Sequence, residues 1–223
     1  MNDIELVIFD CDGVLVDSEL IASEVVAGYM IPFLNQIIGR EEFISQYGGM
    51  PDQEIAKYFA TKYSVSFPIN LHQDIVKEVD KALELKLTQI DGAEACVSKI
   101  GLSKAVASNS PYNRLRCSLS NCGLDKYFKS NIYSSDLVGI PKPSPEIYLY
   151  VANKFGLRPE KCLAIEDSQS GVIAANKAGM LVIGFLGGSH AKKENSHKLI
   201  LAGASHIFYS MHELSEFMAN KFY

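Results

Sequence analysis

The sequence lacks any apolar run approaching the roughly 18–20 residues that a membrane-spanning helix needs, so we expect no contact with a membrane. No basic segment precedes the first apolar run, in MNDIELVIFD, and a signal peptide is therefore not expected. Basic residues are not in excess either, because 21 lysines and arginines stand against 26 aspartates and glutamates, a formal net charge of −5. This balance argues against non-specific binding to nucleic acid or to an anionic membrane surface.

Cysteine and histidine patterns typical of disulfide frameworks or metal sites are also missing. The five cysteines are odd in number and include no CxxC pair, which is typical of reduced thiols in a cytoplasmic protein. Cys11 lies between two aspartates, which disfavour a thiolate, so we expect an inert thiol. The five histidines show no ligand spacing, and His190, His197, His206 and His212 are expected at the surface or at strand edges.

What the sequence does contain is the composition of a folded protein. Hydrophobic residues make up 48% of the 223 residues and charged residues 21%, which is ordinary for a globular chain. These proportions exclude intrinsic disorder, which needs low hydrophobicity and high net charge. The length allows one large domain, or one domain with a smaller addition.

Short apolar runs along the chain indicate buried strands. Their apolar residues are continuous rather than alternating, as expected for strands that are covered on both faces. The runs are 6–9, 104–107, 131–133, 163–165 and 181–183, with 206–208 as a possible sixth. From about residue 91 they alternate with helical patterns such as 144–155 and 168–178, the second with Ser168 as its N-cap. This alternation predicts an α/β fold with a doubly wound, Rossmann-like parallel sheet.

Residues 17–86 differ from the rest because they contain no convincing strand. Apolar residues recur there at helical spacing, as in Ile21, Val25 and Tyr29, and Pro32 is expected to kink or end the first helix. We therefore predict an inserted all-helical domain at 17–86, and an α/β core domain built from 1–16 and 87–223.

Polar side chains follow several of the predicted strands at the point where each strand ends. Because the carboxyl ends of parallel strands meet at one edge of the sheet, we expect these side chains to share a pocket. In chain order they are Asp10, Asp12, Ser108, Asn109, Lys142, Glu166 and Asp167. The sequence therefore predicts a charged pocket at this edge.

The four carboxylates of this pocket require a counter-charge. Two unit charges about 4 Å apart repel by about 4 kcal/mol at an effective dielectric constant near 20, and one lysine cannot neutralise four acids. A divalent cation relieves the repulsion, and Mg²⁺ fits best because it binds one or two carboxylates together with water and phosphate. Ser108, the backbone amide of Asn109 and Lys142 are then suited to phosphate oxygens.

Four segments, in this order along the chain, resemble the four motifs of the haloacid dehalogenase (HAD) superfamily. They are DCDGVLVDS at 10–18, SN at 108–109, Lys142 within GIPKPSPEIY, and IEDSQSG at 165–171. The helical insertion is similar to the four-helix cap of the subgroup that contains β-phosphoglucomutase and many sugar-phosphate phosphatases. Within that subgroup, the segments DCDGVLVDSE and SNSPYNRLR resemble bacterial phosphatases of the phosphogluconate phosphatase type.

The resemblance implies a catalytic role for several of the pocket residues. Asp10 would be the nucleophile that forms an aspartyl-phosphate. Asp12 would protonate the leaving oxygen and then deprotonate the hydrolytic water. Ser108, Asn109 and Lys142 would hold the phosphoryl oxygens, and Lys142 would also neutralise charge beside Asp10.

The same resemblance implies a magnesium site. Asp10, the backbone carbonyl of Asp12 and Asp167 would bind Mg²⁺, and Glu166 would support the metal and its waters. Haloacid dehalogenases proper lack the second aspartate and need no metal. Asp12 and Asp167 are both present here, so dehalogenation is not expected.

Three positions of the helical insertion favour hydrolysis over the mutase reaction, in which the phosphoryl group is returned to the sugar. The resemblance places Ala22 where the mutase has a histidine, and Gly48 and Asp52 where the mutase has a lysine and an arginine. We therefore expect a Mg²⁺-dependent phosphatase acting on a small phosphorylated metabolite, a sugar or sugar-acid phosphate. The alternatives are a phosphosugar mutase, a phospho-receiver signalling domain and a catalytically silent binding module. Family resemblance favours a monomer.

Overall fold

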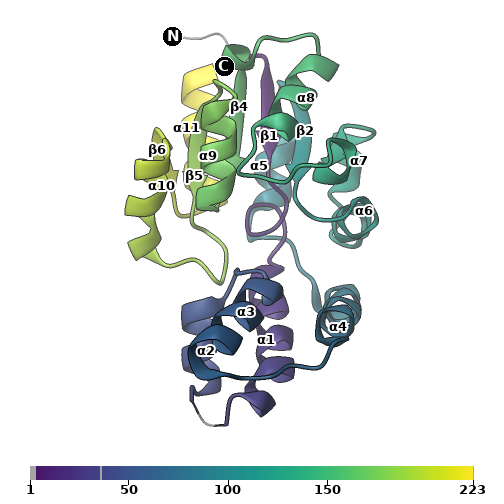
Figure 1. Ribbon diagram of the computed structural model, residues 1–223. Coiled ribbons are helices and arrows are strands. Elements are labelled where there is room, and N and C mark those ends of the chain that lie inside the picture. Colours follow the sequence, from purple (N-terminus) through teal and green to yellow (C-terminus); the bar gives the residue numbers. More distant parts are fainter. Residues whose placement is uncertain (1–3, 36, 223) are drawn as a thin grey trace. The chain divides into compact units, whose positions relative to one another are not determined.

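The computed structural model describes residues 4–35 and 37–222 and divides into two compact units. One unit combines Met1–Asp17 with Thr88–Tyr223, and the other is the continuous segment Ser18–Leu87. Figure 1 shows the first unit as a sheet with helices and the second as helices alone. None of the helices in the described residues is long and apolar enough to cross a membrane.

The strands of the larger unit form one six-stranded sheet within the described residues, in the order β3-β2-β1-β4-β5-β6. Every neighbouring pair is parallel, which confirms the predicted doubly wound α/β fold. The strands are β1 (Leu6–Phe9), β2 (Ser103–Ser108), β3 (Ile132–Ser134), β4 (Cys162–Glu166), β5 (Leu181–Phe185) and β6 (His206–Phe208). Each overlaps one of the six apolar runs, and 206–208 is indeed a strand.

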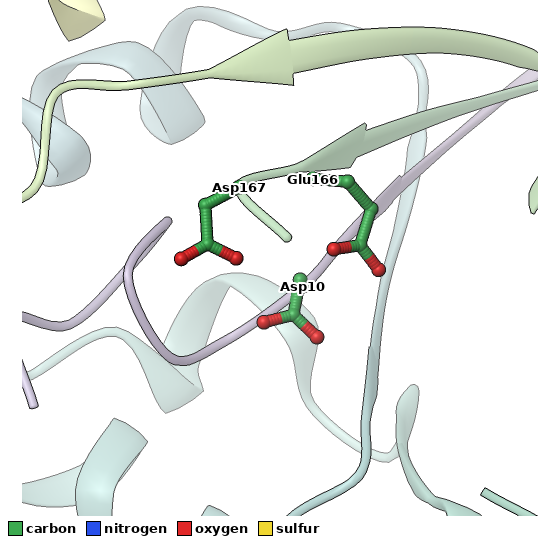
Figure 2. A group of neighbouring side chains, drawn as sticks. All are labelled: Asp10, Glu166 and Asp167. Atoms are coloured by element: carbon green, nitrogen blue, oxygen red, sulfur yellow. The ribbon is translucent and has the colours of Figure 1, made fainter. Parts of the chain in front are cut away.

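The register of the central strands brings their carboxyl ends to one edge. Phe9 of β1 is paired with Ile165 of β4, and the amide of Asp10 donates to the carbonyl of Ile165 at 2.9 Å. Glu166 ends β4 and Asp10 follows β1, so their side chains leave neighbouring strands at the same level. Figure 2 shows these two side chains and that of Asp167 gathered where β1 and β4 end.

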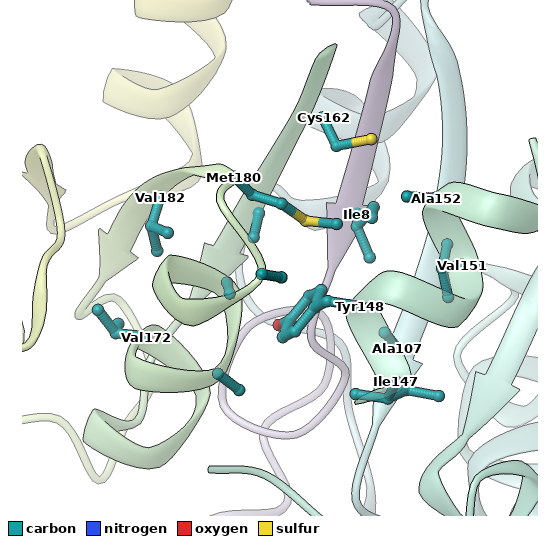
Figure 3. Close-up of a cluster of buried hydrophobic side chains, with 14 of the residues drawn as sticks. Ile8, Ala107, Ile147, Tyr148, Val151, Ala152, Cys162, Val172, Met180 and Val182 are labelled. Carbon is teal, nitrogen blue, oxygen red and sulfur yellow. The ribbon is translucent and has the colours of Figure 1, made fainter. Parts of the chain in front are cut away.

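Both faces of the sheet are covered. Successive residues of a strand point to opposite faces, so each strand contributes side chains to both. On one face, Leu6 and Ile8 belong to a buried cluster with Tyr148 and Met180, shown in Figure 3. On the other face, the ring of Phe9 meets that of Phe128 edge-on, with the centroids 5.9 Å apart. The covering elements include α5 (Ala93–Lys99), α6 (Tyr112–Asn121), α7 (Asp125–Phe128), α8 (Glu146–Lys154), α9 (Gln169–Lys177), α10 (Ser196–Ala202) and α11 (Met211–Phe222).

Within its described residues, the regular elements of the smaller unit are all helical, as the sequence predicts. Its elements are α1 (Glu19–Met30), the 3₁₀ turn η1 (Ile31–Phe33), α2 (Arg40–Tyr47), α3 (Asp52–Tyr63) and α4 (Leu71–Lys86). Pro32 lies in η1, directly after α1 ends. The unit has its own apolar core, in which the rings of Phe43 and Phe59 stack with their centroids 6.2 Å apart.

Candidate active site

Three of the predicted site residues form an acidic cluster where β1 and β4 end. Asp10, Glu166 and Asp167 each offer a carboxylate oxygen, and these oxygens all lie within 4.8 Å of one another (Figure 2). Glu166 is fully buried and Asp10 is 7% exposed. Such burial is uncommon for acidic residues unless they are paired, so the cluster needs positive charge close by.

Lys142 supplies part of that charge from the loop that precedes α8. Its Nζ lies 2.6 Å from Oδ1 of Asp10 and 2.6 Å from Oε1 of Glu166, and it donates to the carbonyl of Ala107 at 2.7 Å. Three acceptors thus face the three N–H donors of the ammonium group. The sequence predicted that Lys142 reaches this edge, and the structure places it between two of the predicted carboxylates.

The positive charge of Lys142 does not fully offset the negative charge of the three carboxylates. Burial raises the pKa of Asp10 despite the nearby ammonium of Lys142, and the carboxylates of Glu166 and Asp167 raise it further. Burial likewise raises the pKa of Glu166. For Lys142, burial alone lowers the pKa, but Asp10 and Glu166 outweigh it and hold the pKa well above its ordinary value. Further positive charge at this site would stabilise the ionised carboxylates.

The donor set fits a hard divalent cation. The three carboxylates offer only oxygen atoms, which are the ligands that Mg²⁺ prefers. Oxygens bound to one octahedral Mg²⁺ lie about 3–4 Å apart, and the cluster already holds its oxygens within 4.8 Å. Asp10, Glu166 and Asp167 are therefore the residues that could hold the metal.

Asp12 lies three residues beyond the end of β1 and faces the end of β2. Its Oδ2 accepts hydrogen bonds from Ser110 Oγ at 2.7 Å and from Ser108 Oγ at 3.4 Å. Ser108 is buried, and its Oγ also accepts from the amide of Ser110 at 3.0 Å. The structure thus brings the predicted Asp12 and Ser108 together and adds Ser110 as the nearer hydroxyl.

The side chain of Asn109 forms two hydrogen bonds with the main chain of Lys142. Its Oδ1 accepts from the amide of Lys142 at 2.8 Å, and its Nδ2 donates to the carbonyl of Lys142 at 3.3 Å. These two bonds hold the main chain of Lys142 in place between Pro141 and Pro143. Asn109 therefore joins the loop after β2 to the loop that carries the ammonium group.

Because Gly13 has no side chain, it leaves room for the carboxylate of Asp167. Its φ of +76° is unfavourable for residues with a side chain. A Cβ at this position would also lie 2.0 Å from Oδ2 of Asp167. Asp167 is followed by Ser168, whose Oγ accepts from the amide of Gly171 and caps α9, as the sequence predicts.

Sequence reasoning did not identify Tyr148 as part of this site. Its hydroxyl donates to Oε1 of Glu166, and the Nζ of Lys142 lies 5.0 Å from its ring centroid. Tyr148 is fully buried on α8, where its position in the sequence is that of an ordinary core residue. The sequence carries no signal for its contact with Glu166, because that contact joins two elements across the fold.

His190 lies in the partly exposed loop after β5, and its contact with the site was not expected. Its Nε2 is 3.2 Å from Oδ2 of Asp167, and its side chain is 24% exposed. Cys11, by contrast, is buried as an inert residue should be, and burial raises the pKa of its thiol, with Asp12 and Asp10 adding to the effect.

Comparison with known proteins shows the family to which the chain belongs. The sequence profile described as haloacid dehalogenase-like hydrolase matches residues 7–185. A 6-phosphogluconate phosphatase of Escherichia coli K12 is 30% identical over 193 residues, which cover 86% of this chain and 87% of the relative. A phosphorylated carbohydrates phosphatase of Thermotoga maritima is 32% identical over 181 residues, covering 79% and 82%.

A solved structure shows the same fold over almost the full length. It is a conserved haloacid dehalogenase-like protein of unknown function from Agrobacterium tumefaciens C58, with 35% sequence identity and a TM-score of 0.90. The match covers 97% of this chain and 98% of the other.

Proposed function

The chain belongs to the haloacid dehalogenase-like hydrolase family and is a phosphatase of that family, and we propose that it hydrolyses a small sugar or sugar-acid phosphate with Mg²⁺. The observation that carries this proposal is the position of Asp10. Its carboxylate is buried, contacts the ammonium of Lys142 and shares an oxygen cluster with Glu166 and Asp167. A carboxylate held in this way suits attack on an electrophilic phosphorus.

In the first half-reaction, a carboxylate oxygen of Asp10 attacks the phosphorus of the substrate. The new O–P bond forms an aspartyl-phosphate while the bond from phosphorus to the leaving oxygen breaks. Asp12 protonates the leaving oxygen, so that the product departs as a neutral alcohol. The hydroxyls of Ser108 and Ser110, which already contact Asp12, orient its carboxyl group for this transfer.

In the second half-reaction, water attacks the phosphorus of the aspartyl-phosphate. Asp12, now a carboxylate, takes the proton of that water, and the bond between Asp10 and phosphorus breaks to release phosphate. Lys142 stays beside Asp10 throughout and stabilises negative charge on the phosphoryl oxygens. Asn109 keeps Lys142 in position through its two bonds to the lysine main chain.

We assign Asp10, Asp167 and the backbone carbonyl of Asp12 as the ligands of the metal. Glu166 would support the bound metal and its water molecules. When bound, Mg²⁺ supplies positive charge that binds and polarises the phosphoryl group. The three-carboxylate oxygen cluster supports this assignment.

The substrate class rests on the relatives and on the helical unit. The relatives named above are a 6-phosphogluconate phosphatase and a phosphorylated carbohydrates phosphatase, which supports a phosphorylated sugar or sugar acid. We propose that Ser18–Leu87 acts as the cap domain and selects the substrate.

Hydrolysis is favoured over a mutase reaction by the chemistry of the helical unit. Asp52 begins α3 and its carboxylate lies 2.8 Å and 3.1 Å from Nδ1 of His72. An acid engaged by a histidine cannot replace the arginine that the mutase has at this position. Ala22 likewise offers no proton-carrying group in place of the mutase histidine.

The test is phosphate release by the purified protein from a panel of phosphorylated sugars and sugar acids, with p-nitrophenyl phosphate included. We expect release that requires Mg²⁺ and stops with EDTA, and a loss of more than about 1000-fold in Asp10→Asn. Loss of phosphate release in Asp10→Asn with an unchanged melting temperature supports the nucleophile. Absence of Mg²⁺-dependent release from every phosphoester would overturn the proposal, and isomer formation without free phosphate would favour the mutase.

A further inference from the structure

The loop that follows β5 brings one histidine to the acidic cluster. In the sheet, Gly184 of β5 is paired with Glu166 of β4, so the two strands end side by side. The chain that leaves β5 therefore runs past Asp167, which follows β4. His190 is on this loop, and its Nε2 is 3.2 Å from Oδ2 of Asp167.

The imidazole of His190 is confined between two glycines. A Cβ at Gly13 would lie 2.8 Å from Cε1 of His190, and a Cβ at Gly188 would lie 2.8 Å from its Nδ1. Neither position can accept a side chain without displacing the ring. The side chain of His190 is 24% exposed and that of Asp167 is 8% exposed, so the contact is largely shielded from water.

The main chain on either side of His190 is also anchored. Ser189 donates to Oδ1 of Asp17 through both its amide, at 3.0 Å, and its hydroxyl, at 2.8 Å. On the other side, the amide of Ala191 donates to the carbonyl of Gly188 at 3.0 Å. A loop held at these points gives the imidazole little freedom to leave Asp167.

We propose that His190 is a positioning residue that fixes the carboxylate of Asp167 for metal binding. An N–H at Nε2 that donates to one oxygen of Asp167 sets the rotation of the carboxylate and leaves its second oxygen to ligate. Hydrogen bonds of this kind to metal ligands commonly contribute 10- to about 100-fold in metal affinity. The inference rests on the proposed function, because it takes Asp167 as a magnesium ligand.

The decisive measurement is Mg²⁺ binding to the full chain without substrate, by isothermal titration calorimetry. We expect His190→Ala to weaken binding by about 10- to 100-fold. His190→Gln should recover most of the affinity, because glutamine carries an N–H donor at its ε position. The matched control is His212→Ala on α11, an exposed histidine of the same unit, which should bind Mg²⁺ like the parent protein.

Kinetics separate positioning from a merely structural role. With a phosphoester substrate, His190→Ala should raise the Mg²⁺ concentration for half-maximal rate and keep kcat at saturating Mg²⁺ within a few-fold. Its melting temperature should match that of His212→Ala. Unchanged Mg²⁺ affinity in His190→Ala, or an equal loss in His190→Gln, would overturn the inference.

The same experiments distinguish failure of the inference from failure of the proposed function. If the parent protein neither binds Mg²⁺ nor requires it for phosphate release, the proposed function fails and takes the inference with it. If the parent protein binds Mg²⁺ and His190→Ala binds it equally well, the inference alone fails.

Discussion

Lys142 and Glu166 form a buried ion pair, with Nζ 2.6 Å from Oε1 and side chains that are 2% and 0% exposed. Glu166 is thereby directed toward the lysine at the same time as it borders the proposed metal site. The pair ties the end of β4 to the loop before α8. Because both charges are removed from water, each is stable only while the other remains.

Lys142→Met should therefore destabilise the fold. The variant leaves Asp10 and Glu166 buried without their cation, and loss of one partner from a buried pair typically costs about 3–5 kcal/mol. Urea denaturation at pH 8 measures the free energy of unfolding. Lys126→Met is the control, because its ion pair with Glu94 is exposed and should contribute little. A Lys142→Met protein as stable as Lys126→Met would contradict the buried pair.

Tyr148→Phe should show how much the hydroxyl of Tyr148 contributes to the free energy of unfolding. The variant keeps the ring in the core and removes the hydrogen bond to Glu166. A hydrogen bond to a charged acceptor contributes about 1.5–3 kcal/mol, so we expect a loss of that size in the free energy of unfolding. Tyr150→Phe on the same helix retains its ring contact with Tyr133 and serves as the control. Equal stability of the two variants would show that the Tyr148 hydroxyl contributes nothing.

Ser110→Ala should slow turnover without preventing folding. Ser110 Oγ is the nearer of the two hydroxyls on Asp12, and loss of one such bond in the transition state corresponds to about a tenfold lower kcat. Steady-state kinetics should show the change in kcat rather than in KM. Ser120→Ala, at an exposed position of α6, should behave like the parent protein. A normal kcat in Ser110→Ala would remove Ser110 from the mechanism.

Thiol labelling should separate the cysteines by their surroundings. Cys117 is exposed, whereas burial raises the pKa of Cys96, Cys122 and Cys162 to about 11 and holds that of Cys11 well above its ordinary value. At pH 8 we expect one thiol to react rapidly with Ellman's reagent in the native protein, and all five to react in urea. Cys117→Ser should abolish the rapid phase and Cys122→Ser should retain it. A rapid phase that survives in Cys117→Ser would contradict the assignment.

Much of the architecture was predictable because it depends on local sequence. Continuous apolar runs marked each strand, and helical spacing in 17–86 marked the insertion. The positions of Asp10 and Glu166 followed from topology, since residues that end parallel strands must share an edge. These inferences required only the neighbours of each residue along the chain.

Other parts of the site could not be inferred in this way. Tyr148 is spaced like a core residue, and nothing around it in the sequence distinguishes its hydroxyl from that of any buried tyrosine. His190 has polar and glycine neighbours typical of a surface loop. Ser110 is one of several serines beside the motif. Each acquires its contact from an element distant in sequence: Glu166, Asp167 and Asp12, respectively.

The sequence by itself determined the α/β class, the helical insertion and which charged residues reach the carboxyl edge of the sheet, because periodicity and strand ends are local properties. Only the tertiary structure decided which of those charges meet. The pairing of Lys142 with both Asp10 and Glu166, and of His190 with Asp167, depends on how strands and loops pack. Distances of a few ångströms between separate segments arise from that packing, and no spacing along the chain encodes them.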